Sequence, residues 1–102
     1  MLDERIEAKV HDAAGVLDRL TPGWDERVVL SAFSIANPWR CILHFAYGAT
    51  RSAYVDGVEA MMQEGFDENV VLENGSPVNV FASSECQDAW VRLIKGRRKV
   101  AA

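Results

Sequence analysis

The chain has 102 residues, of which 49% are hydrophobic and 25% are charged. A chain this short can enclose one hydrophobic core, so we expect one domain and exclude multidomain machinery. The balance of apolar and charged residues is that of a globular protein, which excludes wholesale disorder, collagen-like repeats and a disulfide scaffold.

The two cysteines, Cys41 and Cys86, are too few to hold together a secreted fold of this size. The first residues are charged where a signal peptide would need an apolar core. The apolar runs fall short of the roughly 18 residues that a membrane-spanning helix needs. We therefore expect a cytoplasmic protein with reduced thiols and no membrane contact.

Charge is distributed unevenly along the chain, whose net charge is −4. Residues 52–91 contain eight acidic residues and neither Lys nor Arg, whereas residues 92–102 contain five basic residues and no acid. Residues 1–91 therefore hold 6 of the 11 basic and all 15 acidic residues, a net charge of −9. The sequence predicts an acidic body with a basic C-terminus.

Residues 3–20 carry apolar side chains three and four positions apart, which predicts an amphipathic helix that Thr21-Pro22-Gly23 ends. Gly15 inside this helix indicates either close packing or a fraying end. Trp24 follows the turn as an aromatic anchor. Residues 28–35 fit either a short strand or an irregular buried segment, which periodicity does not distinguish.

Asn37 followed by Pro38 predicts a second helix over residues 38–47, because Asn caps helices and Pro suits the first helical position. This helix is apolar nearly all round, which places it at the centre of the fold. A third helix is predicted from Thr50 to Gly65. Its apolar stripe consists of Tyr54, Val55, Val58, Met61 and Met62.

An Asn74-Gly75 turn signal between two β-branched segments predicts a small hairpin over residues 70–81. Ser84 and Gln87 form a capping-box pattern that predicts the start of a last helix. The inner face of this helix carries Cys86, Ala89, Trp90, Leu93 and Ile94. We expect Gly96 to end the packed part and residues 97–102 to form a solvated basic tail, dispensable for the fold.

These elements predict a mainly α fold in a single domain over residues 1–96. About four helices surround the short buried helix, with a small β-hairpin near residues 70–81. An α+β fold is the alternative.

Dispersed small and aromatic residues occur in a distinctive order along the chain. They are Pro22-Gly23-Trp24, Cys41-Ile42-Leu43, Tyr47-Gly48, Tyr54 with Gly57, Gly65-Phe66 and Ala89-Trp90. In these residues the chain resembles a family of small proteins encoded by phages of actinobacteria, but it has His44-Phe45 where many members have Gly-Gln. The resemblance implies a phage or prophage setting and the host cytoplasm, and no site.

Cys41 and His44 lie one helical turn apart, and with Cys86 and His11 they match the inventory of a tetrahedral zinc site. The spacing lacks a Cys-x-x-Cys knuckle, so we expect no metal and no other cofactor. As nucleophile and base, Cys41 and His44 would need a cleft, an oxyanion donor and a third group. The sequence indicates none of these, so a small enzyme is an alternative that we do not favour.

The acidic stretch is either a solvated face or a surface complementary to a basic partner, including one that imitates the charge of DNA. The nine aromatic residues either complete the core or reach the surface as an interaction patch. We favour a non-enzymatic phage accessory protein that binds, and could inhibit, a host or phage protein, with a homodimer as a further option. The candidate partner-binding residues are Asp56, Glu59, Glu64, Asp67, Glu68, Phe45 and Tyr54.

The alternative function is weak association with nucleic acid through the basic C-terminal segment. The candidate residues are Arg92, Lys95, Arg97, Arg98 and Lys99. A basic last turn is also what the helix dipole favours, and an acidic body would repel a duplex. Nucleic acid is therefore not the partner that we expect.

Overall fold

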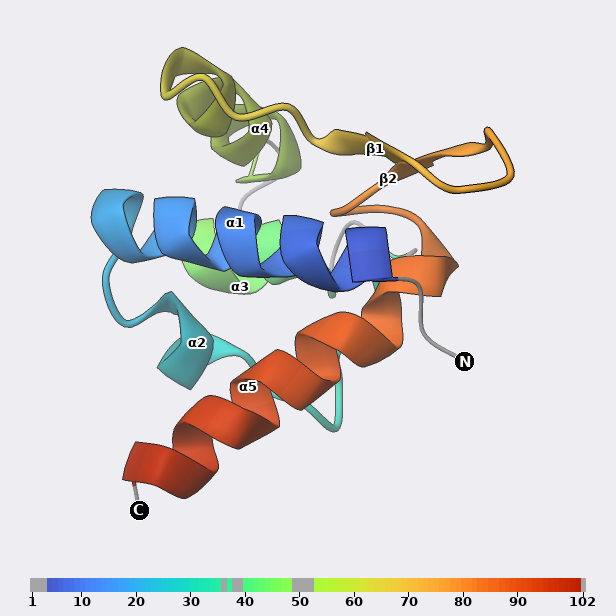
Figure 1. The fold of residues 1–102 in the computed structure, drawn as a ribbon. Coiled ribbons are helices and arrows are strands. Elements are labelled where there is room, and N and C mark those ends of the chain that lie inside the picture. Colours follow the sequence, from blue (N-terminus) through green and yellow to red (C-terminus); the bar gives the residue numbers. More distant parts are fainter. Residues whose placement is uncertain (1–3, 36, 38–39, 49–52, 102) are drawn as a thin grey trace.

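The structure is a computed structural model that describes residues 4–35, 37, 40–48 and 53–101 (Figure 1). The elements are α1 Glu4–Leu20, α2 Trp24–Arg27, α3 Ile42–Tyr47, α4 Ala53–Gln63, β1 Asn69–Val71, β2 Pro77–Asn79, the 3-10 helix η1 Ser84–Cys86 and α5 Gln87–Ala101. The fold is mainly helical with a small hairpin, as the sequence predicts. Within the described residues, no helix combines the length and the apolar character needed to cross a membrane.

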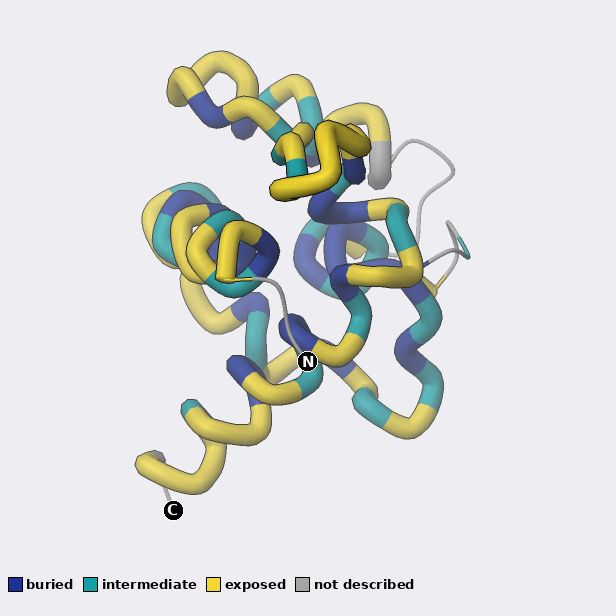
Figure 2. The backbone as a smooth tube through the Cα atoms, turned by 45° about the vertical axis from the view of Figure 1, so that its right-hand side comes forward, coloured by how far each residue is buried: buried dark blue, intermediate teal, exposed yellow. Residues whose placement is uncertain are grey.

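Helix α1 runs through the middle of the molecule (Figure 1). Helix α4 and the hairpin lie on one side of it and α5 lies on the other. The predicted amphipathic pattern is confirmed, because Ile6, Val10, Ala13, Ala14, Val16 and Leu17 are buried. Buried positions lie toward the interior in the helices and in β2, whereas β1 has no buried residue and the last turns of α5 are largely exposed (Figure 2). The buried residues form one hydrophobic cluster.

A row of aromatic rings crosses the core and joins four segments. Trp90 of α5 meets Trp24 of α2 edge to face, with ring centroids 5.7 Å apart, and stacks on Phe81 at 5.6 Å. Phe81 in turn lies 6.1 Å from Phe66. Both indole N–H groups are satisfied, since Trp90 donates to the Val80 carbonyl at 2.7 Å and Trp24 donates to a carboxylate of α1 at 2.9 Å. The aromatic residues of this row therefore complete the core.

Helices α3 and α4 approach closely because residue 57 is a glycine. A Cβ atom at Gly57 would lie 2.9 Å from Leu43 Cδ2 and 3.1 Å from the Tyr47 ring. The C-terminal end of α4 follows the predicted glycine signal, with Gly65 at φ 82°. The N–H groups of Gly65 and Phe66 donate to the carbonyls of Met62 and Met61, which is the Schellman pattern.

The helix predicted over residues 38–47 is present, but its predicted start is wrong. Helix α3 begins at Ile42, after Cys41. Asn37 belongs to a turn instead, because its N–H donates to Ser34 and its carbonyl accepts from Arg40. The Ser34 N–H also donates to the Arg40 carbonyl at 3.0 Å, so Arg40 pairs with residues before it instead of starting a helix. Pro38 and Trp39, like the predicted cap Thr50, lie outside the described residues.

Residues 28–35 take the irregular alternative, with successive turns in which Ala32 N–H donates to Val29 and Phe33 N–H to Leu30. The predicted hairpin is confirmed, and its register pairs Asn69 with Asn79, Val70 with Val78 and Val71 with Pro77. Gly75 takes φ 86° in the turn. Pro77 is the first residue of its strand, a position that tolerates the missing N–H.

Three predictions about helix faces and ends need correction. Val55 and Met62 are exposed, at 55% and 61%, because neighbouring helices cover only part of α4. Gln87 does not complete a capping box with Ser84, since its Oε1 accepts a hydrogen bond from the Ile35 N–H at 3.0 Å. Gly15 lies in a helix that continues to Leu20, and a Cβ there would meet no neighbouring group within 4 Å, so close packing is not its reason.

The predicted end of the packed part at Gly96 is also wrong, because Arg97 and Arg98 form hydrogen bonds to other segments. Helix α5 continues through Gly96 to Ala101, and all five residues of the predicted inner face are buried. The cost of a glycine inside a helix, about 1 kcal/mol, is offset here by contacts that the following arginines make.

Replacing Trp90 with Ala tests the aromatic row. We expect the substitution to cost about 3–5 kcal/mol, a large share of the roughly 5–15 kcal/mol that stabilises a domain, so the variant should be largely unfolded. The measurement is circular dichroism with urea denaturation. Val100→Ala on the same helix is the control, because Val100 is 89% exposed. A Trp90→Ala variant as stable as this control would contradict the central role of the row.

Candidate functional site

A groove with a volume of about 610 Å³ lies between α1 and α5. It forms where α5 diverges from α1 toward the C-terminal end of the chain (Figure 1). The lining residues are Glu7, His11, Asp25, Arg92, Leu93, Gly96, Arg97 and Val100. Its exposed wall is mostly apolar, because Leu93 and Val100 face it and Gly96 contributes no side chain. A volume of this size falls within the range of ligand sites in proteins.

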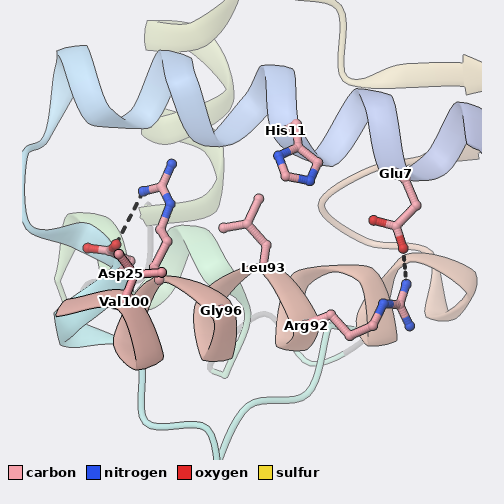
Figure 3. A pocket seen from close by; sticks show the side chains of 8 residues that line it. Glu7, His11, Asp25, Arg92, Leu93, Gly96 and Val100 are labelled. Carbon is pink, nitrogen blue, oxygen red and sulfur yellow. Dashed lines mark hydrogen bonds and ion pairs between the residues drawn. The ribbon is translucent and has the colours of Figure 1, made fainter. Parts of the chain in front are cut away.

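Ion pairs close both ends of the groove (Figure 3). At one end the Arg92 guanidinium pairs with Glu7 of α1. At the other end Arg97 pairs with Asp25 at 3.2 Å and with Asp18 at 2.8 Å. Leu93 lies between the two ends in Figure 3. Because these charged groups neutralise one another, the middle of the groove favours apolar groups.

Asp18 is the acceptor on which one end of the groove depends. Its two carboxylate oxygens accept hydrogen bonds from Arg97 at 2.8 and 2.9 Å, and Oδ1 also accepts the Trp24 indole N–H at 2.9 Å. The hydrogen bond from Arg97 lowers the pKa of Asp18 most, against the opposing effect of burial. The Arg97 guanidinium also lies 5.5 Å from the centre of the Trp24 ring, within the range of a cation–π contact.

Arg98 attaches the end of α5 to the segment around α2. Its Nη2 donates to the carbonyl oxygens of Asp25 at 2.9 Å and Val28 at 2.6 Å. These carbonyls lie at the C-terminal end of a short helix, where backbone acceptors lack partners within the helix. The predicted solvated tail over residues 97–102 is therefore wrong for Arg97 and Arg98, which are structural contacts.

The five basic residues proposed for nucleic-acid contact divide into two groups. Arg92, Arg97 and Arg98 donate to carboxylates or carbonyls of this same chain. Lys95 and Lys99 are exposed, and neither forms an ion pair with a residue that the structure describes. Phosphate contact by the arginines would compete with these internal bonds.

The cysteines are placed where reactivity is low. Cys41 and Cys86 are both free and buried. Burial raises the pKa of the Cys41 thiol, and burial together with Glu85 raises the pKa of Cys86 to about 11. Reactive thiols have lowered pKa values and partial exposure. Among the described residues, no three His, Cys, Asp or Glu side chains lie close enough to hold a metal ion.

The predicted acidic residues lie in α4 and in the segment directly after it. Asp56, Glu59, Glu64 and Asp67 are exposed, whereas Glu68 is half-buried. The structure does not place the two predicted aromatic residues on a common surface with these acids. Phe45 is half-buried in α3, where it packs against the core and the His44 ring, and the Tyr54 side chain lies outside the described part.

Two exposed apolar side chains take the place of the predicted aromatics. Val55 and Met62 lie seven residues apart, which is two helical turns, so they share one face of α4. Glu59 lies between them on this face, Asp56 lies to one side of it, and Glu64 follows the last residue of the helix. We define Val55, Asp56, Glu59, Met62 and Glu64 as the α4 surface. No ion pair joins its three acids to another residue in the described ranges.

The groove could not be predicted from the sequence, because its two walls come from opposite ends of the chain. Glu7 and His11 come from α1, and Leu93 and Val100 come from α5. The available signal was Gly96, a poor helix former that lies inside an otherwise amphipathic helical pattern. We interpreted it as the end of the packed part, whereas it lies on the wall of the groove.

Deleting residues 97–102 tests the structural role of the arginines. The deletion removes the Arg97 and Arg98 hydrogen bonds, so we expect a loss of about 1–3 kcal/mol, or roughly 5–15 °C in Tm. Scanning calorimetry gives the measurement. The double variant Lys95→Ala/Lys99→Ala, which removes two exposed charges from the same helix, should change Tm by only about 2 °C. Equal Tm values for the deletion and the wild type would support the original prediction that residues 97–102 form a solvated tail.

Asp18 should make stability depend on acidic pH. Because the folded pKa of Asp18 lies below its unfolded value near 3.9, its contribution is present above that pH and is lost as pH falls through the folded pKa. Asp18→Asn should remove this dependence and lower stability at pH 7 by about 0.5–1 kcal/mol, since solvent screens the half-exposed pair. Urea denaturation from pH 2 to 7 measures both effects. An Asp18→Asn variant whose pH profile matches that of wild type would contradict this role of Asp18.

No protein-family model, curated protein or solved structure matches the chain.

Proposed function

We propose that this protein is a non-enzymatic binding module that captures a basic partner protein through the α4 surface. The observation that carries the proposal is the combination of exposed apolar and acidic groups on one helix face. Val55 and Met62 are each more than half exposed, and the charges beside them are all negative. A single exposed apolar residue is ordinary, but two on one face with unpaired acids are typical of an interface.

The acids of α4 have no basic partner within their own helix. Asp56 and Glu59 lie three residues apart, and the helix holds no Lys or Arg with which they could pair. A partner that supplies basic groups would relieve this repulsion and would desolvate the two apolar side chains together. The complementary partner is therefore a basic surface with apolar side chains, such as a Lys-rich amphipathic helix.

The resemblance to proteins of actinobacterial phages suggests where such a partner is met. In our proposal the partner is a host or phage protein in the cytoplasm of an infected bacterium. The buried, protonated thiols support a binding role over catalysis by Cys41 and His44. The internal bonds of Arg92, Arg97 and Arg98 favour a protein partner over nucleic acid.

A synthetic peptide of 18 residues, with Leu on one helical face and Lys on the other, tests the proposal. We expect wild type to bind the labelled peptide in fluorescence anisotropy, and Glu59→Lys/Met62→Ser to bind at least about tenfold more weakly, because it removes one charge pair and one apolar contact. Circular dichroism checks that the variant is folded.

The matched control is Glu26→Lys/Val29→Ser. It makes the same change of charge and apolarity at exposed residues near α2, where Val29 is 51% exposed. Its affinity for the peptide should stay within about twofold of wild type. The two residues lie outside the α4 surface, so the peptide is affected only through the overall net charge of the protein. Equal loss in the two variants would show that overall acidity attracts the peptide, and would refute a specific α4 surface.

A further inference from the structure

A pocket separate from the groove lies where α4 ends and the chain turns toward β1. Its volume is about 400 Å³, and its lining consists of Met62, Gly65, Phe66, Asp67, Glu68 and Asn69. We call it the α4-end pocket. We propose that it receives a lysine side chain of the basic partner, whose ammonium group donates hydrogen bonds to Glu68 and Asp67. The inference rests on the proposed function, because it names the contact that fixes the basic partner on α4.

Glu68 holds a carboxylate at a position that the hairpin turns inward. The Val80 N–H donates to the Glu68 carbonyl at 2.8 Å, one pair beyond Asn69 and Asn79, so the register of the hairpin extends to these two residues. Residues directly opposite each other in an antiparallel pair share one face, and Val80 is fully buried. Glu68 is accordingly half-buried, on a face where the hairpin otherwise places apolar residues.

One oxygen of this carboxylate has no hydrogen-bond donor among the described residues. Glu68 Oε2 is buried, and no N–H or O–H group of the described ranges donates to it. A buried polar atom without a partner is rare in folded proteins, because it gives up hydrogen bonds to water and gains none. The negative charge of a carboxylate is shared by its two oxygens. A cation in the pocket that Glu68 lines would therefore neutralise this group.

The chain does not supply that cation itself. Lys9 of α1 lies nearby, but its Nζ is 4.6 Å from the centre of the Phe66 ring and it lines a neighbouring pocket. No ion pair joins Lys9 to Asp67 or Glu68 in the part of the chain that the structure describes. The described lining of the α4-end pocket includes two acids and no Lys, Arg or His. Its complement is therefore a positive charge from another molecule.

The lining favours a lysine over a metal ion. Calcium and similar ions take six or more oxygen ligands, whereas among the described residues no three His, Cys, Asp or Glu side chains lie close enough to hold a metal ion. Met62 and Phe66 instead provide apolar groups, against which the four-carbon stem of a lysine packs while its charged head stays at the carboxylates.

Asp67 is held in position to share the ammonium group with Glu68. Its Oδ1 accepts the Asn69 N–H at 2.9 Å, which fixes the carboxylate and leaves Oδ2 for a further donor. An ammonium group has three donors that point in different directions, so it suits two separate carboxylates. The planar fork of an arginine matches both oxygens of one carboxylate instead.

The pocket continues the α4 surface. Val55, Glu59 and Met62 share one face of α4, and Met62 also lines the pocket. The helix ends at Gln63, so the pocket lies at the end of this face. An amphipathic helix whose Leu side chains cover Val55 and Met62 therefore carries a lysine to the pocket. This contact fixes one basic group in place, whereas the exposed acids of α4 attract basic groups without fixing them.

Trimethylation of the Leu/Lys peptide separates this hydrogen-bonded contact from attraction by charge. Trimethyl-lysine keeps its positive charge but has no N–H group to donate. In fluorescence anisotropy, we expect trimethylation of every lysine to weaken binding to wild type at least about fivefold. Glu68→Gln should bind the unmodified peptide at least about fivefold more weakly than wild type does. Trimethylation should then change the affinity of this variant by less than about twofold, because the contact is already lost.

The matched control is Glu73→Gln, the same change at an exposed hairpin residue that does not line the pocket. It should lose affinity on trimethylation as wild type does. Circular dichroism checks that each variant is folded. Asp67→Asn provides a second test that does not alter a buried atom, because Asp67 is exposed and Asn keeps the acceptor for the Asn69 N–H. Trimethylation should weaken binding to this variant less than about threefold.

The inference is overturned if trimethylation leaves binding to wild type unchanged, or if it weakens binding to wild type, Glu68→Gln and Asp67→Asn by the same factor. In these cases the proposed function stands, provided that the unmodified peptide still binds wild type and loses affinity for Glu59→Lys/Met62→Ser. If wild type does not bind the unmodified peptide at all, the proposed function and the lysine pocket fail together.

Discussion

Trp90 is the side chain through which the distant parts of this chain are held in register. Its ring meets Trp24 and Phe81 in the core, and its N–H binds the carbonyl of Val80. These contacts fix α5 against both α2 and the end of the hairpin. A cation lies over the ring at each end of the aromatic row, with Lys9 over Phe66 at 4.6 Å and Arg97 over Trp24. The direction of α5, and with it the shape of the groove, follows from this row.

Because α5 is fixed in this direction, its C-terminal arginines reach the segment around α2. Arg97 binds Asp18 and Asp25, and Arg98 binds two backbone carbonyls. The basic end of the chain therefore has two roles. Its arginines close one end of the groove and hold α2 in place, whereas Lys95 and Lys99 remain available to a partner. In the sequence the arginines and lysines count equally as positive charges. Burial and hydrogen bonding in the structure distinguish the two groups.

Periodicity in the sequence was sufficient for the helices that bury one continuous stripe, because α1 and the inner face of α5 obey the spacing of 3.6 residues. It failed where tertiary contacts override local signals. The Asn37-Pro38 capping pattern did not start a helix, because Ser34 and Asn37 form backbone hydrogen bonds with Arg40 instead. Gly96 was expected to end the packed part of the last helix, but the arginines after it form contacts with α1 and with the segment around α2. The candidate site was predicted in its acidic part only, since the exposure of Val55 and Met62 depends on which neighbours cover α4.

Charge acts on capture of the proposed basic partner at two distances. Contacts between the α4 acids and basic groups of the partner are attractive at short range, where salt screens them least. The net charge of −4 also attracts a basic protein over longer distances, which raises the rate of encounter. At about 0.1 M ionic strength the screening length is near 10 Å, which removes most of the long-range attraction while leaving close contacts in place. Raising the salt concentration to this level therefore slows encounter more than it weakens the bound complex. The position of the acids on α4, rather than the overall acidity of the chain, then determines which basic partners stay bound.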